Sequence, residues 1–454
     1  MNLRNESRLT LRLALPLMIG QLSQMLLGVA DTVMIGRLGV MELAALTFAT
    51  ALFHLPFVFG IGVLTAVSVF TSNRRGACDA AGARQSCRDG LVLGTLLGLL
   101  MFVLSWPLSS HLGIFGQPAE VIERTPVYFR IVMFSVVPAL ASIALKNHAD
   151  ALNRPWPAFW IFLGGVLLNI ALNWIMIFGK LGCPALGFEG AAWATLISRT
   201  AILLAMMFWL RHAKGLHDWV PRRWFRGTNR REVMAMLALG LPASAQMIFE
   251  VGAFSFAALL MGRIGPDAMA AHQIAVTLAA TAFMVPLGLS MALTVRFGEA
   301  HGAGDNQRLR SIAVSGWLLG IACSLLAAAA FLMLGKAMAA AFTDDPAVIG
   351  LTASLLVIVG IFQIFDASQV SSAAMLRGLH DTRGPAIISF VSYWICGMPV
   401  AGLLALGMDM GARGVWWGLA AGLAVACVTL GPRLWRRCGH AHQVDDQEAA
   451  KHAR

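Results

Sequence analysis

Residues 240–263 read GLPASAQMIFEVGAFSFAALLMGR, an almost unbroken apolar run. The hydrocarbon core of a bilayer is about 30 Å thick, and a helix of about 20 apolar residues crosses it. Glu250 lies near the middle of this run. At about 1.5 Å per residue, it is about 20 Å from Arg263 and about 28 Å from Arg231 along the helix axis, too far to reach either surface. The stretch therefore predicts a membrane-spanning helix with a carboxyl group deep inside it.

Similar apolar segments recur along the whole chain. Of its 454 residues, 58% are hydrophobic and only 13% are charged, and the mean hydropathy is +0.72. Ordinary soluble proteins contain about 25% charged residues. We therefore predict an all-α integral membrane protein with twelve transmembrane helices. They are expected at roughly 10–35, 43–72, 90–110, 124–148, 156–178, 188–211, 233–262, 267–297, 308–341, 347–377, 383–407 and 413–435.

The basic residues are concentrated in alternate loops. The net charge is +11, and 26 of the 34 Lys and Arg residues lie near loops on the same predicted side as both termini, whereas six lie near the other loops. This is the positive-inside pattern of membrane proteins. We therefore expect both termini in the cytoplasm, contacts between the basic loops and anionic membrane lipids, and no nucleic-acid partner.

The seven cysteines follow no ligand pattern. They are scattered, odd in number and include no CxxC pair, so they predict neither a disulfide framework nor a zinc site. The first apolar helix carries Gln21, Gln24 and Asp31 and exceeds the length of a signal peptide, so we expect it to be retained.

The two halves of the chain share one pattern. A shift of 226 residues aligns residues 16–79 with 242–305 without a gap, and a later segment aligns at a shift of 224. Six helices per half is an even number, so both halves enter the membrane in the same direction, as in the parallel repeats of many secondary transporters. The aligned pairs include Pro16 with Pro242, Gly36 with Gly262, Gly39 with Gly265, GACD (76–79) with GAGD (302–305), and GFEGAAW (187–193) with GARGVWW (411–417).

The repeat predicts two six-helix lobes. Pro16 and Pro242 are expected to kink equivalent helices, and Gly36 and Gly262 to form equivalent tight turns. The expected divisions are an N-terminal lobe at 1–210, a cytoplasmic basic linker at 211–232, a C-terminal lobe at 233–437 and a cytoplasmic tail at 438–454.

Three acidic residues, Asp31, Glu250 and Asp366, lie within predicted transmembrane helices. An ionised acid there costs about 2.5–3.5 kcal/mol on insertion scales, which makes each a candidate functional residue. Glu250 aligns with Gln24 and Asp31 with Ala257, so these two carboxyl groups are not part of the repeated scaffold. Polar neighbours at helical spacing predict a hydrated cavity between the helices. These neighbours are Gln21, Gln24, Gln246, Gln363, Gln369, Ser372, Asn169 and Asn173.

A buried carboxyl group can exchange a proton near physiological pH. A cation that enters the cavity would compete with that proton for the same oxygen atoms, and this competition is the minimal requirement for antiport. Inward movement of one elementary charge across 100 mV releases about 2.3 kcal/mol, which can drive a cationic compound outward. Carboxylate and amide oxygens suit both H⁺ and Na⁺ exchange, so the choice of ion stays open.

Several segments in a fixed order resemble the multidrug and toxic compound extrusion (MATE) family, especially its NorM-like branch. The resemblance spans most of the chain, and the order and spacing of the segments make it specific. The segments are LPLMIGQLSQMLLGVADTVMIG (15–36), LGLPASAQMIFEV (239–251), AHQIA (271–275), IFQIFDASQV (361–370), MLRGLHDTRGP (375–385), SYWICGMP (392–399) and GVWWGL (414–419).

The resemblance implies two lobes that alternate between outward-facing and inward-facing states, coupled to Na⁺ or H⁺, and that expel cationic, aromatic compounds. It places the family's helix-7 and helix-10 acids at Glu250 and Asp366. It places the helix-1 acid at Asp31, near the polar pair Asn169 and Asn173. Either set of residues is a possible Na⁺ site. Gln273 and Tyr393 are secondary cavity candidates. One departure is that NHADALNRPWP (147–157) lacks the Gly-rich turn of the second half.

Together these features predict a multi-pass antiporter of a bacterial cytoplasmic membrane, with no cofactor, no enzymatic activity and no obligate protein partner. The expected partners are cationic drugs or toxins and membrane lipids. A flippase for a lipid-linked precursor is the main alternative, although its pyrophosphate would favour a more cationic cavity than three acids and two helix-embedded arginines provide. An intramembrane enzyme is disfavoured because the sequence has no HExxH motif, and a passive channel because it needs no titratable group.

Overall fold

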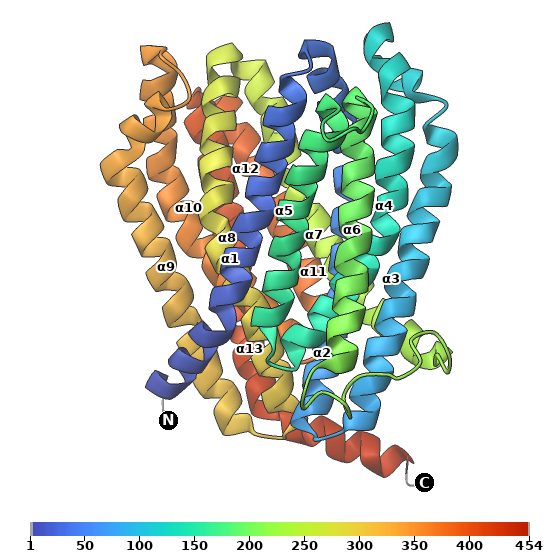
Figure 1. Cartoon of the computed structure of the whole chain (residues 1–454). Helices are drawn as coiled ribbons and strands as arrows, with labels where there is room; N and C mark the ends of the chain where they lie inside the picture. The colour runs from blue at the N-terminus through green and yellow to red at the C-terminus, as the bar shows by residue number, and fades with distance from the viewer. Residues whose placement is uncertain (1–2, 453–454) are drawn as a thin grey trace. The chain divides into compact units, whose positions relative to one another are not determined.

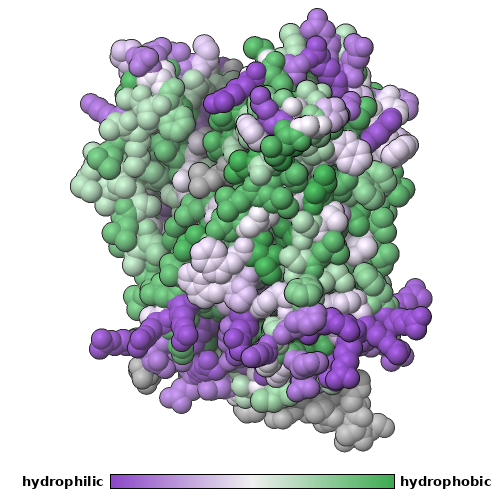
Figure 2. Space-filling model, viewed as in Figure 1, coloured by the Kyte–Doolittle hydropathy of each residue, from purple (hydrophilic) through white to green (hydrophobic). Residues whose placement is uncertain are grey.

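The computed structural model describes residues 3–452, and the side chains of all of these except 26, 27 and 440–452. Within that range every regular element is a helix, and twelve helical segments are long and apolar enough to cross a membrane. On the face shown in Figure 2, hydrophobic side chains cover the middle of the helices and hydrophilic ones gather at their ends. The predicted all-α membrane fold with twelve transmembrane helices is confirmed.

The first half of the chain forms six long helices, which are coloured from blue to green in Figure 1. Their boundaries lie within a few residues of the apolar windows or extend beyond them into the polar ends. They are α1 (Leu3–Gly36), α2 (Val40–Gly76), α3 (Ala80–Leu108), α4 (Ala119–Ala151), α5 (Pro155–Phe178) and α6 (Gly187–His212), with a short 3₁₀ turn, η1 (Leu112–Phe115), between α3 and α4.

The second half repeats this order, but its eleventh span changes its winding. The stretch from residue 383 to 407 contains two π-helical segments, in which hydrogen bonds join residues five apart and the helix widens. The elements are α7 (Arg230–Ile264), α8 (Pro266–Gly302), α9 (Asn306–Ala340), α10 (Pro346–Gly378), α11 (Arg383–Phe390), η2 (Val391–Gly397), α12 (Met398–Gly402), η3 (Leu403–Gly407) and α13 (Gly411–His452).

The helices group into two compact units. The N-terminal unit comprises residues 22–244, and the C-terminal unit comprises residues 1–21 and 245–454. Both divisions fall inside a long helix, α1 or α7, so each of these helices contributes to both units. The lobe boundaries expected from the sequence, at the linker 211–232, remain a prediction.

Each unit is built around one central helix. In the N-terminal unit α4 packs against α2, α3 and α6, and in the C-terminal unit α10 packs against α8, α9 and α13. The two central helices occupy equivalent places in the repeat. Within the C-terminal unit, α1 begins and α13 ends at the same end of the helices (Figure 1).

The repeated turns use the same backbone conformation in both halves. Gly39 before α2 has φ 156° and Gly265 before α8 has φ 148°, values that favour glycine. Gly36 and Gly262 do not have positive φ, so the backbone at these two positions does not itself require glycine. The turn needs its special backbone three residues later, where the next helix starts.

The segment 147–157 forms the same turn as its counterpart, despite its different composition. Asn153 after α4 has φ 57° and His380 after α10 has φ 61°. The backbone N–H of Asn153 donates to the carbonyl oxygen of Asp150, and that of His380 donates to the carbonyl oxygen of Arg377, both at 3.0 Å. Neither half therefore uses glycine at this left-handed position. In the second half, Gly378 instead permits close packing, since an added Cβ would lie 2.7 Å from Phe297.

Two equivalent glutamates, Glu6 and Glu232, anchor the first turns of α1 and α7. In the C-terminal unit, Glu6 pairs with Arg296 of α8, and Arg308 Nε lies 3.6 Å from its carboxylate. In the N-terminal unit, Glu232 pairs with Arg74 of α2. Glu6 and Glu232 are 226 residues apart, the period of the repeat.

The segment between α6 and α7 is attached to the N-terminal unit. Arg88 of α3 donates to the carbonyl groups of Arg223, at 3.1 Å, and Gly227, at 3.0 Å. The amide of Asn229 donates to Asp89 at 3.1 Å. Leu216 and Val220 are buried in the unit's hydrophobic core. The basic linker is therefore packed onto α3, although its own arginines remain exposed.

Candidate functional site

Glu250 and Tyr393 meet in the C-terminal unit. Glu250 lies on α7, and Tyr393 lies in the π-helical segment η2. The Tyr393 hydroxyl lies 3.5 Å from Oε1 of Glu250, a long contact, and Tyr393 is fully buried. Beside this pair, the indole of Trp394 donates to the carbonyl oxygen of Phe249 at 3.1 Å. The widened helix thus presents two neighbouring aromatic side chains to the turn of α7 that carries Glu250.

Asp366 of α10 belongs to the same cluster. It is buried, its Oδ1 atom has no hydrogen-bond partner, and it lies close enough to Glu250 and Tyr393 to interact with both electrostatically. Gln369, one turn further along α10, is also buried, and neither polar atom of its amide has a partner. Buried polar groups in proteins are usually hydrogen-bonded. The cluster therefore holds oxygen atoms of Asp366 and Gln369 that can accept a hydrogen bond or bind a cation, and an amide N–H₂ of Gln369 that can donate to water.

Arg377 also belongs to this cluster. Its place near the end of the tenth predicted span suggests a loop arginine, whereas its positive charge acts on Glu250. Arg377 lies eleven residues after Asp366, which is three helical turns and returns to nearly the same face of α10. That spacing is the signal that could have indicated it.

The glutamines predicted for the cavity have different surroundings. Gln363 is buried and donates to the carbonyl oxygen of Ala279 on α8 at 2.8 Å, so it links two helices. Gln246 is buried on α7, one turn before Glu250. Gln273 is exposed on α8, Gln21 is half-buried on α1, and Gln24 is exposed on α1.

In the N-terminal unit, Asp31 heads a chain of hydrogen bonds. The Asn173 amide of α5 donates to Oδ1 of Asp31 at 2.6 Å and lies 3.1 Å from Oδ1 of Asn169. Asn169 in turn donates to Thr195 of α6 at 3.4 Å. The side-chain oxygen of Asn173 is buried without a partner. The structure therefore brings Asp31, Asn169 and Asn173 together.

The positive charge of Arg199 on α6 acts on Asp31. Its guanidinium group donates to Ser135 at 2.7 Å and lies over the ring of Phe53, 5.1 Å from the centroid. Arg130, the other arginine within the predicted helices, donates instead to the hydroxyl groups of Ser109 and Ser110. Only Arg199 of these two is therefore placed to balance a membrane carboxylate.

Each unit thus contains a carboxyl-centred polar cluster within apolar helices. In the described part of the chain, no group of three or more His, Cys, Asp or Glu side chains forms a metal site. Two repeated helical units, each with an ionisable group at membrane depth, define a polytopic membrane transport protein.

The sequence model of the MatE family matches residues 16–175 and 242–403, which include Asp31, Asn169, Asn173, Glu250 and Asp366. The chain belongs to the MATE family, whose members are membrane transporters and not enzymes. The resemblance inferred from the sequence motifs is confirmed.

Relatives and solved structures match nearly the whole chain. The probable multidrug resistance protein NorM of Mesorhizobium japonicum is 35% identical over 441 residues, covering 96% of this chain and 94% of the relative. The multidrug resistance protein PmpM of Pseudomonas aeruginosa is 34% identical over 462 residues, covering 99% of this chain and 97% of the relative. Among solved structures, that of a multidrug resistance MATE family transporter in its outward-facing conformation matches with a TM-score of 0.88. The two sequences are 23% identical, and the match covers 96% of this chain and 97% of that chain.

Proposed function

We propose that the protein is an efflux antiporter that exchanges H⁺ or Na⁺ for cationic, aromatic organic compounds. The names of the relatives, which are multidrug resistance proteins, support multidrug efflux. One observation supports the proposal of ion exchange. Asp366 is buried beside Glu250 and Tyr393, and one of its carboxylate oxygens has no hydrogen-bond partner.

Two neighbouring carboxyl groups of like charge cannot both remain ionised and unpaired in a medium of low dielectric constant. A proton, Na⁺ or an organic cation bound between Glu250 and Asp366 would relieve that repulsion. Because each of them would satisfy the same oxygen atoms, binding of one would displace another. The Arg377 charge that acts on Glu250 would weaken cation binding and favour release.

Asp31 with Asn169 and Asn173 is proposed as a second, ion-sensitive site. Its carboxylate accepts a hydrogen bond from Asn173, and the free amide oxygen of Asn173 adds a neutral ligand of the kind that suits Na⁺. Imposing Na⁺ and pH gradients separately would distinguish Na⁺ from H⁺ as the coupling ion.

The test is efflux from proteoliposomes in which Na⁺ and pH gradients are imposed separately. We expect a fluorescent organic cation to move against its gradient with one of the two ions in the wild type, and this uphill movement to be lost in Glu250→Gln and in Asp366→Asn. Asp344→Asn is the control, because it removes one carboxylate from an exposed loop. Uphill efflux that persists in both site variants would refute the assignment.

We further propose that the protein resides in a bacterial cytoplasmic membrane with both termini in the cytoplasm. The bacterial relatives and the twelve apolar helices support the membrane. The distribution of Lys and Arg supports the orientation.

A further inference from the structure

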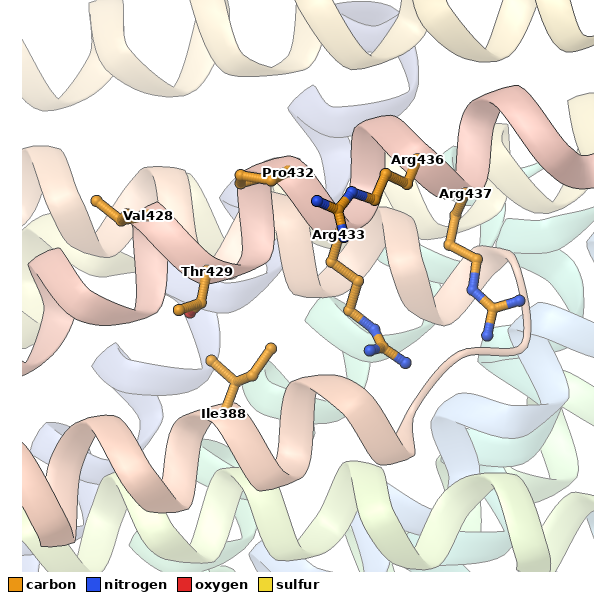
Figure 3. Close-up of a pocket in the computed structure, with 7 residues that line it drawn as sticks. All are labelled: Ile388, Val428, Thr429, Pro432, Arg433, Arg436 and Arg437. Atoms are coloured by element: carbon orange, nitrogen blue, oxygen red, sulfur yellow. The ribbon is translucent and has the colours of Figure 1, made fainter.

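A basic groove lies between α11 and α13 of the C-terminal unit, apart from the carboxyl cluster. Its volume is about 630 Å³. Arg433, Arg436 and Arg437 line one part of it. Figure 3 shows Arg433 and Arg437 extending from α13 into the space on the α11 side.

The rest of the groove is mostly apolar. Its lining comes from Val428, Thr429 and Pro432 on α13 and from Ile388 on α11, which points toward α13 (Figure 3). Residues 428, 429, 432, 433 and 436 are spaced by one, three, one and three positions, so they share one face of α13. That face therefore changes from apolar to strongly basic along the helix axis. Val428 is 74% exposed, which leaves the apolar part accessible.

One arginine of the groove is held in place by its surroundings. Arg433 donates to both carboxylate oxygens of Asp381, at 2.8 and 3.1 Å. An added Cβ at Gly384 would lie 2.3 Å from Nε of Arg433, so glycine lets this side chain lie directly against α11 in its present position. Arg437 Nε lies 3.4 Å from the same carboxylate. The guanidinium groups of Arg433 and Arg437 thus share a single carboxylate, so this part of the groove keeps an excess positive charge.

The groove lies at the helix ends that the charge distribution predicts to be cytoplasmic. Trp435, on the same stretch of α13, is 47% exposed, and Arg310 of α9 lies over its ring at 5.9 Å. Exposed tryptophans beside basic residues are typical of the membrane–water interface. A ligand of this groove would therefore meet both lipid headgroups and acyl chains.

We propose that this groove is a binding site for an anionic phospholipid. The arginines contact the phosphate diester, for which a planar guanidinium with several donors is well suited. The apolar part, with Val428 and Ile388, takes the beginning of an acyl chain. The match of a basic end to an apolar end favours a lipid over a free phosphate ion, which would need only the arginines.

The test uses the purified full-length protein in detergent, titrated with phosphatidylglycerol or phosphatidylcholine of identical acyl chains and followed by native mass spectrometry. We expect the wild type to prefer phosphatidylglycerol, and Arg436→Gln with Arg437→Gln to weaken that binding about tenfold without changing phosphatidylcholine binding. The double variant Arg226→Gln with Arg230→Gln is the matched control, because it removes two exposed arginines outside the groove. It should bind phosphatidylglycerol like the wild type.

A second variant tests the apolar part without changing charge. Val428→Trp fills the groove at an exposed position and is expected to lower phosphatidylglycerol binding several-fold. Equal losses in the groove and control double variants would overturn the proposal, because binding would then follow total charge. Displacement of the lipid by equimolar inorganic phosphate, with no effect of Val428→Trp, would also overturn it by assigning the groove to a free anion.

Discussion

Cys78 and Gly304 occupy the same turn of the repeat with different side chains. Both have left-handed backbone, with φ 57° at Cys78 and φ 68° at Gly304, and the next residue of each, Asp79 or Asp305, caps the following helix. This conformation costs a side chain with Cβ about 1–2 kcal/mol, whereas glycine adopts it freely but loses more entropy on folding. This turn of the first half therefore carries a strain that the equivalent turn of the second half lacks.

We expect Cys78→Gly to stabilise the protein by about 1 kcal/mol and Gly304→Cys to destabilise it by a similar amount. Thermal unfolding in detergent, followed by tryptophan fluorescence, measures both. Ala77→Gly is the control, because Ala77 has φ −78° and gains nothing from glycine. A midpoint for Cys78→Gly at or below that of Ala77→Gly would contradict the strain argument.

The acidic site residues could be identified from the sequence because ionised groups are costly in a bilayer. Asp31, Glu250 and Asp366 stand out for that reason alone. Their partners depend on tertiary structure. Tyr393 approaches Glu250 from a π-helical segment, and no local pattern in residues 391–397 predicts that winding.

At the scale of helices, the pairs made by Glu6 and Glu232 fix where α1 and α7 begin. Arg296 is buried and also donates to the carbonyl oxygen of Glu6 and to Thr10, both at 2.6 Å. Arg74 also donates to Ser86 at 2.6 Å. Each glutamate therefore completes a network around a partly or fully buried arginine, and its loss leaves a guanidinium group without its counter-charge.

We expect Glu232→Gln to destabilise the first turns of α7 by about 2 kcal/mol, which corresponds to roughly thirtyfold faster amide exchange. Hydrogen–deuterium exchange measured by mass spectrometry should show this at residues 230–244 and not at 3–21. Glu6→Gln should give the reverse pattern, so each variant is the control for the other. Uniform acceleration across both segments would show that the pairs are not local anchors.

For the whole molecule, the sequence predicts the helices and the duplication because both depend on patterns that recur over long stretches. Apolar length predicts each span, and the 226-residue shift predicts the equivalence of α4 and α10. The division of the chain into units is different. It falls within α1 after Gln21 and within α7 after Ser244, in uninterrupted helices, and only packing between distant segments determines it.

The orientation of the whole chain gives the last prediction. Leu181 lies in the loop between α5 and α6, is 82% exposed, and belongs to a loop with a single lysine, Lys180. Arg226 lies in the basic segment between α6 and α7 and is also exposed. In a variant without native cysteines, a membrane-impermeant maleimide added to intact cells should label Leu181→Cys and leave Arg226→Cys unlabelled until the cells are opened. Both positions are exposed, so accessibility of the side chain does not distinguish them and only the side of the membrane does. Labelling of Arg226→Cys alone in intact cells would contradict the predicted orientation, because the positive-inside rule places arginine-rich loops in the cytoplasm.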